Sequence, residues 1–337
     1  MKLTDNKTSS TKQCIAANTA ELFGLASPQR IRQNLTIDLT EHSYLPKAGD
    51  PRSDWVATVA YPAFMAIKQM AIGSSTVDRF GTIGTGTGLD ALAAIEVFGC
   101  SDVVITDLHQ DVVKAAAENV IKNLQDDAAP VKILSLTGDL LEPLNQTQSE
   151  FDLIYENLPN IPLCDGGSMQ HEQTSSSFVD SRSESIPDFV NKNLLTLHYL
   201  AIIEAEGHLA DNGAILSSIG ARIPLSSILD TATAAGAMGT ILTYTWKVQS
   251  EPEEVIGGYA AWQKRGLGPF NFYPIDILDD TFSNIDMVAA GDQALAIEHA
   301  LQPHRLDAIT AYEAHRKGCK LGHTVAVLMS RFNGAHK

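Results

Sequence analysis

The residues with the clearest chemical potential lie in a glycine-rich segment and in the apolar run that follows it. The stretch FGTIGTGTGL, residues 80–89, places Gly84, Gly86 and Gly88 at alternate positions between an apolar run and an apolar helical pattern. Glycines let the backbone turn tightly and let a ligand approach, and the following helix offers its N-terminal dipole. The next apolar run, VVITD, ends at Asp107. These features predict a loop that holds a nucleotide.

The spacing of the glycines discriminates between nucleotide classes. The dinucleotide fingerprint is G-x-G-x-x-G, whereas this chain has G-x-G-x-G with Leu89 where the third dinucleotide glycine would stand. A P-loop would require a lysine followed by serine or threonine, and no such pair closes this loop. The spacing therefore disfavours NAD and a P-loop nucleotide.

Alternating strand and helix patterns must position these residues. From residue 78 the short apolar runs RFGTI, VVITD, VKILSL and FDLIYENL alternate with the helical patterns LDALAAIEVFG and QDVVKAAAENVIKNL. Such alternation predicts an α/β fold with a mostly parallel, Rossmann-like sheet. A helix (VNKNLLTLHYLAIIEAEGHLA), two strands (DNGAILSSIG and ILTYTWKVQ) and a last, antiparallel edge strand (GHTVAVLMSRF) follow.

The first 75 residues have a different pattern. Helical spacing occurs in CIAANTAELFGL and in WVATVAYPAFMAIKQMA, where Pro62 predicts a kink or a helix boundary. We therefore expect a helical cap over residues 1–75 and a nucleotide-binding domain over residues 76–337. The cap would close over the site and exclude water.

Composition limits the partners. The 337 residues include 40 acidic and 24 basic ones, which gives a formal net charge of −16. Lys and Arg are not clustered in any stretch of the sequence. Nucleic acid is therefore not expected as a partner. The start MKLTDNKTSS has no apolar core, and no long apolar stretch follows anywhere. We expect a cytoplasmic, soluble protein that acts on a small molecule without a membrane, and its oligomeric state stays open.

Cysteine usage argues against a metal centre. The four cysteines lie far apart, with no C-x-x-C pair and no histidine at ligand spacing: Cys14, Cys100, Cys164 and Cys319. We expect no metal. Cys100 follows a predicted helix end and is interpreted as a buried thiol.

Taken in order, the motifs over residues 78–220 resemble the class I S-adenosylmethionine-dependent methyltransferases. That family has a strand followed by G-x-G-x-G, and the resemblance implies S-adenosylmethionine as the cofactor. It further implies that Asp107 accepts hydrogen bonds from the ribose hydroxyls, and that Asp139, in GDLLEPL, contacts the adenine amino group, with Leu108 and Leu140 beside them. Two other interpretations stay open: Gly88 could serve helix packing, and Asp139 could cap a helix.

The segment ENLPN resembles the N-P-P-Y motif of a methyltransferase subgroup that modifies planar amides and amines. Asn157 and Pro159 keep two positions of that motif, while Leu158 replaces the first proline and Asn160 the aromatic residue. The resemblance implies that Asn157 binds the nucleophile as well as lying beside the cofactor. Asn157 is the first candidate for a catalytic residue, with Tyr155 and Glu156 as alternatives.

Two further features concern the pocket. Thr82 stands where the family has an acidic residue that orients the methionine ammonium, and Glu156 or the cap could substitute for it. Pro159 and Asn160 are candidates for the substrate pocket, and Phe178 and Tyr199 could supply its aromatic wall. The polar segment 164–186 is either a disordered loop or a substrate loop. Residues 251–275 could line the site or an interface.

Three functions remain open on the sequence alone. The first is methyl transfer to a small molecule, at nitrogen. The second is cyclisation of the cofactor itself, in which its α-amine attacks its γ-carbon and expels methylthioadenosine to give azetidine-2-carboxylate; the altered ENLPN, Thr82 and the cap are similar to azetidine-2-carboxylate synthases. The third is an inactive S-adenosylmethionine-binding protein.

Overall fold

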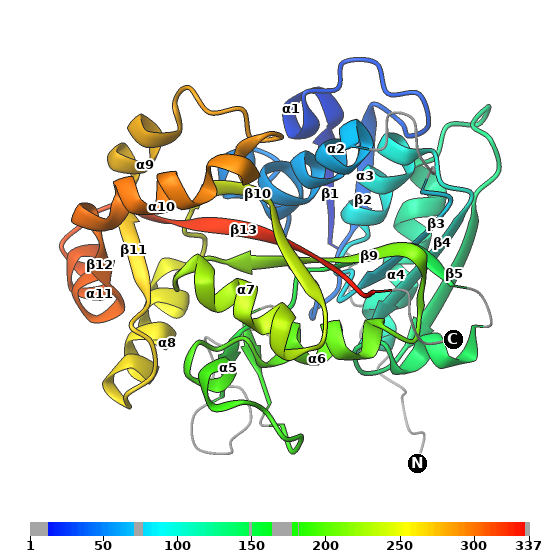
Figure 1. The fold of residues 1–337 in the computed structure, drawn as a ribbon. Helices are drawn as coiled ribbons and strands as arrows, with labels where there is room; N and C mark the ends of the chain where they lie inside the picture. The colour runs from blue at the N-terminus through cyan, green and yellow to red at the C-terminus, as the bar shows by residue number, and fades with distance from the viewer. Residues whose placement is uncertain (1–12, 71–76, 148–149, 164–176, 181, 334–337) are drawn as a thin grey trace, which may run out of the picture.

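A large, mostly parallel sheet forms the centre of the molecule (Figure 1). The computed structural model describes residues 13–70, 77–147, 150–163, 177–180 and 182–333. The main strands lie in the order β5 (Lys132–Thr137), β4 (Asp102–Asp107), β3 (Arg79–Ile83), β6 (Phe151–Glu156), β9 (Leu209–Gly220), β13 (Leu321–Arg331) and β10 (Met238–Val248). The first five of these strands are parallel, and β13 runs antiparallel to both β9 and β10.

This sheet confirms the predicted fold class, a Rossmann-like α/β sheet with an antiparallel end. Within that end β13 is flanked by β9 and β10 rather than outermost, and its residues 321–330 are all buried. Both faces of β13 are covered, which explains why GHTVAVLMSRF reads as a nearly continuous apolar run. The carboxyl ends of β3, β4, β6 and β9 point to the same edge, where open α/β sheets bind ligands.

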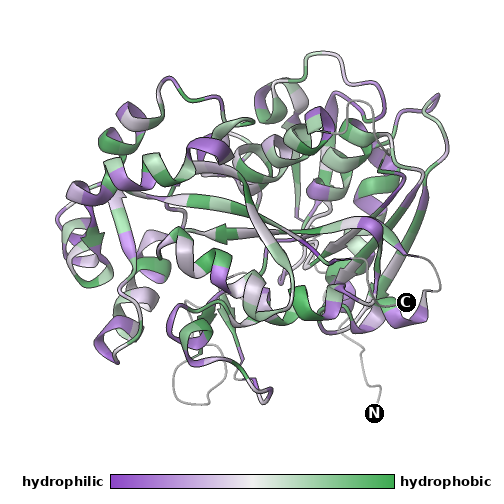
Figure 2. Ribbon diagram, viewed as in Figure 1, coloured by the Kyte–Doolittle hydropathy of each residue, from purple (hydrophilic) through white to green (hydrophobic). Residues whose placement is uncertain are grey.

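Helices cover both faces of the sheet. On one face α2 (Tyr61–Met70) packs beside α3 (Leu89–Phe98), and α6 (Thr196–Ala205) and α7 (Leu225–Ala234) lie on the other (Figure 1). Helix α4 (Gln110–Asn123) packs near β4 and β5 and has an apolar face and a polar face. Figure 2 shows apolar residues along β13 and mixed colouring on the outer helices. The pattern fits buried strands and half-exposed helices.

The N-terminal region is only partly helical. CIAANTAELFGL, predicted as helix, forms β1 (Cys14–Asn18) and the short α1 (Thr19–Phe23), because β1 pairs antiparallel with β2 (Asn34–Asp38). The side chain of Asn18 then caps α1 by accepting from the amide of Ala20. The predicted boundary near Pro62 is confirmed: a π-helical turn, η2 (Val56–Ala60), passes into α2 one residue before the proline.

Between β6 and β9 the predicted single helix is two helices. Helix α5 (Asp188–Lys192) ends before α6 because Leu194 has φ +56°, which a continuous helix does not allow. Most of the polar segment predicted as a loop, residues 164–176 and 181, lies outside the described residues, as does the N-terminal stretch 1–12. Its described flanks form the short parallel pair β7 (Ile161–Pro162) and β8 (Phe178–Val179).

The remaining elements surround the antiparallel end of the sheet. They are η1 (Pro51–Ser53), η3 (Glu142–Gln146), α8 (Pro252–Lys264), β11 (Asn271–Pro274), α9 (Ile275–Phe282), η5 (Ala290–Gln293), α10 (Ala294–Leu301), η6 (Gln302–His304), β12 (Leu306–Asp307) and α11 (Ala308–Arg316). Among the described helices, none has the length and apolar character needed to span a bilayer.

Candidate active site

A cavity of about 540 Å³ lies at the carboxyl ends of the parallel strands. Its volume is within the range of small-molecule and cofactor sites. The lining comes from the glycine loop, from the ends of β4, β6 and β9, from the N-terminal region and from α8. One space therefore joins the predicted nucleotide loop to the predicted substrate residues.

The glycine loop has the backbone that its sequence predicts. Gly84 and Gly86 line the cavity with φ of +64° and +55°, values that only glycine adopts at little cost. A Cβ on Gly86 would meet no atom within 4 Å, so the loop leaves open space there. Gly88, outside the lining, has φ +82°, and a Cβ on it would lie 3.0 Å from the carbonyl oxygen of Ala116 on α4. Packing therefore accounts for Gly88.

Asp107 lies at the edge of this loop. One carboxylate oxygen accepts from the amide of His109 at 3.1 Å, and the other is 3.4 Å from the amide of Gly86. Burial raises the pKa of Asp107, and those two amides oppose the shift. Each oxygen keeps a further lone pair for a ligand hydroxyl.

Asp139 lines the cavity together with Leu108 and Leu140, but its carboxylate already has a partner. Arg182 donates from Nη1 to Asp139 at 2.7 Å and also pairs with Glu184. The structure therefore adds an ion pair to the two roles considered for Asp139, and an adenine contact would share the carboxylate with Arg182.

The ENLPN loop follows β6 and faces the cavity. Asn157, Pro159 and Asn160 line it, as does Phe178. The buried Oδ1 of Asn160 has no hydrogen-bond partner among the described residues, which leaves it available to an N–H donor. Tyr155 also lines the cavity, and its hydroxyl accepts from Ser218 at 3.0 Å.

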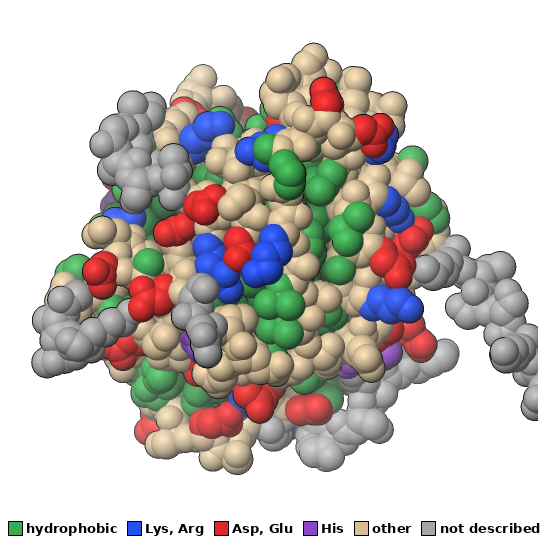
Figure 3. Space-filling model, turned by 90° about the vertical axis from the view of Figure 1, so that its right-hand side faces the viewer, with side chains coloured by type: hydrophobic (Ala, Val, Ile, Leu, Met, Phe, Trp, Pro, Cys, Tyr) green, Lys and Arg blue, Asp and Glu red, His purple; other side chains and the backbone are tan. Residues whose placement is uncertain are grey.

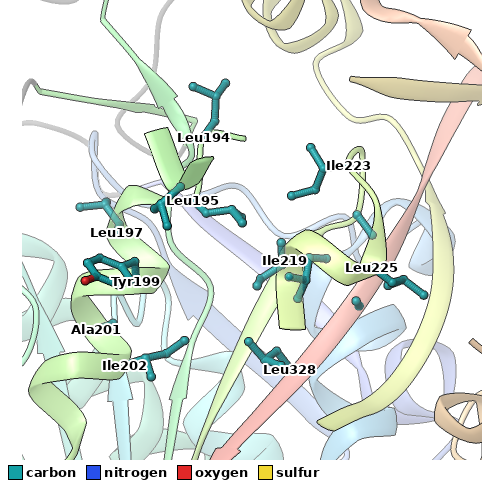
Figure 4. Close-up of a cluster of buried hydrophobic side chains, with 14 of the residues drawn as sticks. Leu194, Leu195, Leu197, Tyr199, Ala201, Ile202, Ile219, Ile223, Leu225 and Leu328 are labelled. Carbon is teal, nitrogen blue, oxygen red and sulfur yellow. The ribbon is translucent and has the colours of Figure 1, made fainter. Parts of the chain in front are cut away.

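Besides Gly88, three predicted site residues lie outside the cavity lining: Thr82, Glu156 and Tyr199. Glu156 is fully buried, 2.7 Å from Nδ1 of His198, and accepts from the amide of Leu158 at 3.2 Å, so it holds the ENLPN loop. Tyr199 belongs to the apolar cluster of α6 (Figure 4). Thr82 points its hydroxyl at the carboxylate of Asp90.

Sequence reasoning missed Asp90, a buried carboxylate in the first turn of α3 that lines the cavity. Besides the hydroxyl of Thr82, that of Thr85 donates to it at 3.1 Å and the amide of Ala91 at 2.8 Å. Burial raises its pKa from 3.8 to about 6 against these hydrogen bonds. Asp90 thus supplies a carboxylate next to Thr82, the residue that stands where the sequence resemblance would place an acidic side chain. The only sequence signal is one acid in the apolar run LDALAAI.

Other cavity residues come from distant segments. The N-terminal region contributes His42, Tyr44 and Trp55, β9 is followed by Arg222, and α8 contributes Tyr259. Part of the segment 251–275, whose role the sequence left open, therefore lines the site. No sequence motif marks these residues, because only the fold brings them together.

One group of side chains has metal-ligand chemistry, although the sequence predicts no metal. His42, His109 and Asp111 offer ligand atoms within 4.8 Å of one another. The two imidazoles stack with centroids 4.3 Å apart, and Nδ1 of His42 lies 3.2 Å from Asp111. Stacking and this ion pair account for the group. Cys100 is a buried thiol, as its sequence context predicts, and burial raises its pKa to about 12.

The surface near β5 carries charges of both signs. Figure 3, which faces the right-hand side of Figure 1, shows Lys and Arg interspersed with Asp and Glu and with apolar side chains. Among the described residues on this face, the basic side chains lie next to acidic ones, unlike the extended basic patch that binds a phosphate backbone.

Comparisons with known proteins found similar chains among the solved structures alone. No protein-family model and no curated protein matches the chain. A methyltransferase from Pyrococcus furiosus is 17% identical, with 67% of this chain and 85% of that chain covered and a TM-score of 0.39. The ribosomal protein L11 methylase from Lactobacillus delbrueckii is 17% identical over 54% and 70%, with a TM-score of 0.34.

A third solved structure, precorrin-6y C5,15-methyltransferase from Geobacter metallireducens, is 11% identical over 56% of this chain and 76% of that chain, with a TM-score of 0.34.

Proposed function

We propose that the protein transfers the methyl group of S-adenosylmethionine to a nitrogen atom of a small molecule. The observation that carries this proposal is that the glycine loop and Asp107 line the same cavity as Asn157 and Asn160. Such a transfer mainly requires donor and acceptor to be held next to each other, and both sets of residues line this cavity.

The residues present fit the cofactor. Gly86 leaves room where a Cβ would project, Asp107 keeps lone pairs for ribose hydroxyls, and Asp90 offers a buried carboxylate for the methionine ammonium. Leu108 and Leu140 give apolar surface beside Asp139 for the adenine ring. Bound there, the cofactor supplies an electrophilic carbon next to a sulfonium.

The remaining residues orient the acceptor. A nitrogen nucleophile must be neutral, and an amide oxygen that accepts its N–H leaves its lone pair directed forward. Asn157 and the unpartnered Oδ1 of Asn160 offer such oxygens. The aromatic rings of Tyr44 and Trp55 add apolar surface to the same space, and each already has a lysine over it, Lys47 at 5.7 Å and Lys247 at 4.9 Å from the ring centroid.

A second candidate is cyclisation of the cofactor to azetidine-2-carboxylate and methylthioadenosine. The specific observation in its favour is Asp90, whose pKa is raised to about 6 by burial. A carboxylate with a raised pKa is a better base, and it would take the proton that the α-amine must lose before it attacks.

Incubation of the purified protein with S-adenosylmethionine, alone and with a panel of amines, tests both candidates. We expect adenosylhomocysteine and a methylated product only when an amine is present, as detected by mass spectrometry. Methylthioadenosine formed without an added acceptor would establish cyclisation instead. If calorimetry detects no binding of S-adenosylmethionine, neither reaction is supported.

A further inference from the structure

Arg222 is a buried cation at the end of the cavity formed by β9 and α8. It is only 4% exposed, and it lines the cavity. Its guanidinium lies over the rings of Tyr259 and Phe272, with centroid distances of 4.7 and 5.3 Å. Nη2 donates to Oε1 of Gln249 at 2.7 Å and lies 3.1 Å from Nε2 of His323.

These neighbours do not satisfy the hydrogen-bonding capacity of Arg222. A guanidinium has five N–H donors. Nη1 has only a 3.4 Å contact with the hydroxyl of Tyr259, and the buried Nε has no partner. Within the part of the chain that the structure describes, no carboxylate forms an ion pair with Arg222. A buried charge without a counter-ion is costly to the fold.

Two further basic side chains, Lys247 and His323, are both fully buried near Arg222, and its charge favours their uncharged forms. Burial and the charge of Arg222 lower the pKa of Lys247 to about 7, and burial, Arg222 and Lys247 lower that of His323. The acids whose charges act on Lys247 are already engaged. Asp54 accepts from the amides of residues 47, 56 and 57, and Glu251 pairs with the side chain of Lys47 at 2.5 Å.

The position of Arg222 assigns this charge to the acceptor end of the cavity. Strand β6 separates β9 from β3, so the end of β9 lies two strands away from the glycine loop. With neighbouring strands about 4.8 Å apart, that separation is roughly 10 Å across the sheet. Asn157 and Asn160 follow β6, the strand between β3 and β9, and line the same cavity as Arg222. A ligand beside these asparagines would therefore present its far end to Arg222.

We propose that Arg222 binds a carboxylate of the acceptor, so that the substrate class is amines that carry a carboxylate, such as amino acids. This inference rests on the proposed methyl transfer. The planar fork of arginine matches a carboxylate and supplies the donors that its own neighbours leave unused. The same chemistry could reach the carboxylate of the cofactor's methionine part, and the experiment separates these two sources.

Calorimetry measures the affinity of wild type for S-adenosylmethionine. In a second titration, with the cofactor part filled by adenosylhomocysteine, L-amino acids are compared with their C-terminal amides. We expect at least one amino acid to bind about tenfold or more tightly than its amide, the discrimination that a charge-assisted hydrogen bond provides. Arg222→Met should abolish this discrimination and leave the affinity for S-adenosylmethionine unchanged.

Arg265→Gln is the matched control, because Arg265 also lies over an aromatic ring of α8, that of Trp262 at 5.1 Å, but does not line the cavity. It should behave as wild type. Equal binding of acids and amides by wild type would overturn the proposal. So would an equal loss of affinity for S-adenosylmethionine and for the amino acid in Arg222→Met, which would assign Arg222 to the cofactor.

Thermal unfolding separates binding from a structural role. Because Arg222→Met removes an uncompensated buried charge and keeps an apolar stem on the rings of Tyr259 and Phe272, its melting temperature without ligand should equal or exceed that of wild type. Should it fail to fold, Gly220→Ala takes its place, since a Cβ there would lie 2.0 Å from Nη1 of Arg222 and displace the guanidinium with its charge retained. Undiminished discrimination in Gly220→Ala would contradict the proposal. Failure of wild type to bind S-adenosylmethionine would contradict only the proposed methyl transfer.

Discussion

At the scale of single residues, the cavity depends on carboxylates placed where water is scarce. Asp90 is 6% exposed and accepts three hydrogen bonds, yet burial still makes its ionised form unfavourable. A ligand ammonium would stabilise the ionised carboxylate. In the ligand-free protein the buried charge of Asp90 therefore lowers the free energy of unfolding, and ligand binding would remove this cost.

Asp90→Asn should therefore change how stability depends on pH. The pKa of Asp90 rises from 3.8 to about 6 on folding, so the folded protein holds this proton more tightly than the unfolded chain. Wild type should lose stability as the pH rises through this interval, whereas Asp90→Asn should not. Without ligand, the variant should gain up to about 3 kcal/mol relative to wild type by pH 7, as measured by urea unfolding from pH 4 to 7.

The control for this prediction is Asp111→Asn. Asp111 is the second residue of α4, as Asp90 is of α3, but it is exposed. Burial raises the pKa of Asp111, but the hydrogen bond and the charge of His42 together with further hydrogen bonds outweigh it, so the net shift is downward and the titration has the opposite sign. A gain in Asp111→Asn equal to that in Asp90→Asn would show that the effect is not due to burial.

At the scale of elements, the glycine loop links ligand binding to helix packing. Gly86 faces open space in the cavity, whereas Gly88 begins α3 against the backbone of α4. Both have positive φ, so both should tolerate a side chain poorly, but for different reasons.

Gly86→Ala and Gly88→Ala should separate these reasons. Gly86→Ala should cost about 1–2 kcal/mol of stability from backbone strain and lose most affinity for S-adenosylmethionine, because its Cβ projects into the nucleotide space. Gly88→Ala should cost more stability, because its Cβ would also lie 3.0 Å from the Ala116 carbonyl oxygen. Thermal unfolding and calorimetry on both variants test this, and equal stability losses would contradict it.

Local sequence predicts some elements better than others. Strands β3, β4 and β6 read as apolar runs because the centre of a parallel sheet is buried on both faces. Strand β1 was missed because its pairing with β2 is a contact across many residues, which local spacing does not encode. The break between α5 and α6 was also missed, because the residue with positive φ there is Leu194 and not a glycine.

The site residues likewise fall into those that a local motif predicts and those that only the complete fold brings together. The glycines and Asp107 lie in one continuous motif, and the structure brings Gly84, Gly86 and Asp107 to the cavity. Trp55 and Arg222 reach the cavity from segments far away in the sequence, so their participation depends on the complete fold.

At the scale of the whole molecule, the N-terminal region is part of the core. Phe64 of α2 is fully buried and packs against Phe80 and Tyr155, with ring centroids 5.5 and 5.1 Å away. Strand β2 is held by α4, whose Asn123 accepts from the amide of Thr36 at 2.9 Å. A cap that merely closed over the site would not share these contacts.

A chain that begins at residue 76 should therefore fail to fold. We expect the shortened chain to aggregate or to unfold without a cooperative transition. It lacks α2, so apolar surface on β3 and α3 would be exposed. Circular dichroism during heating, with gel filtration, measures this. Cooperative unfolding of the shortened chain would support the division into a cap and an independent domain that the sequence predicts.

The place of β13 has a consequence for synthesis. This strand, the last of the described sheet, lies between β9 and β10, which are translated well before it. In the described sheet β9 and β10 pair with β13 and not with each other. During synthesis the edges that they present to β13 therefore stay unpaired until β13 has been translated. A chain that stops before β13 would leave the edges of β9 and β10 that β13 covers unpaired, and such edges favour aggregation and degradation.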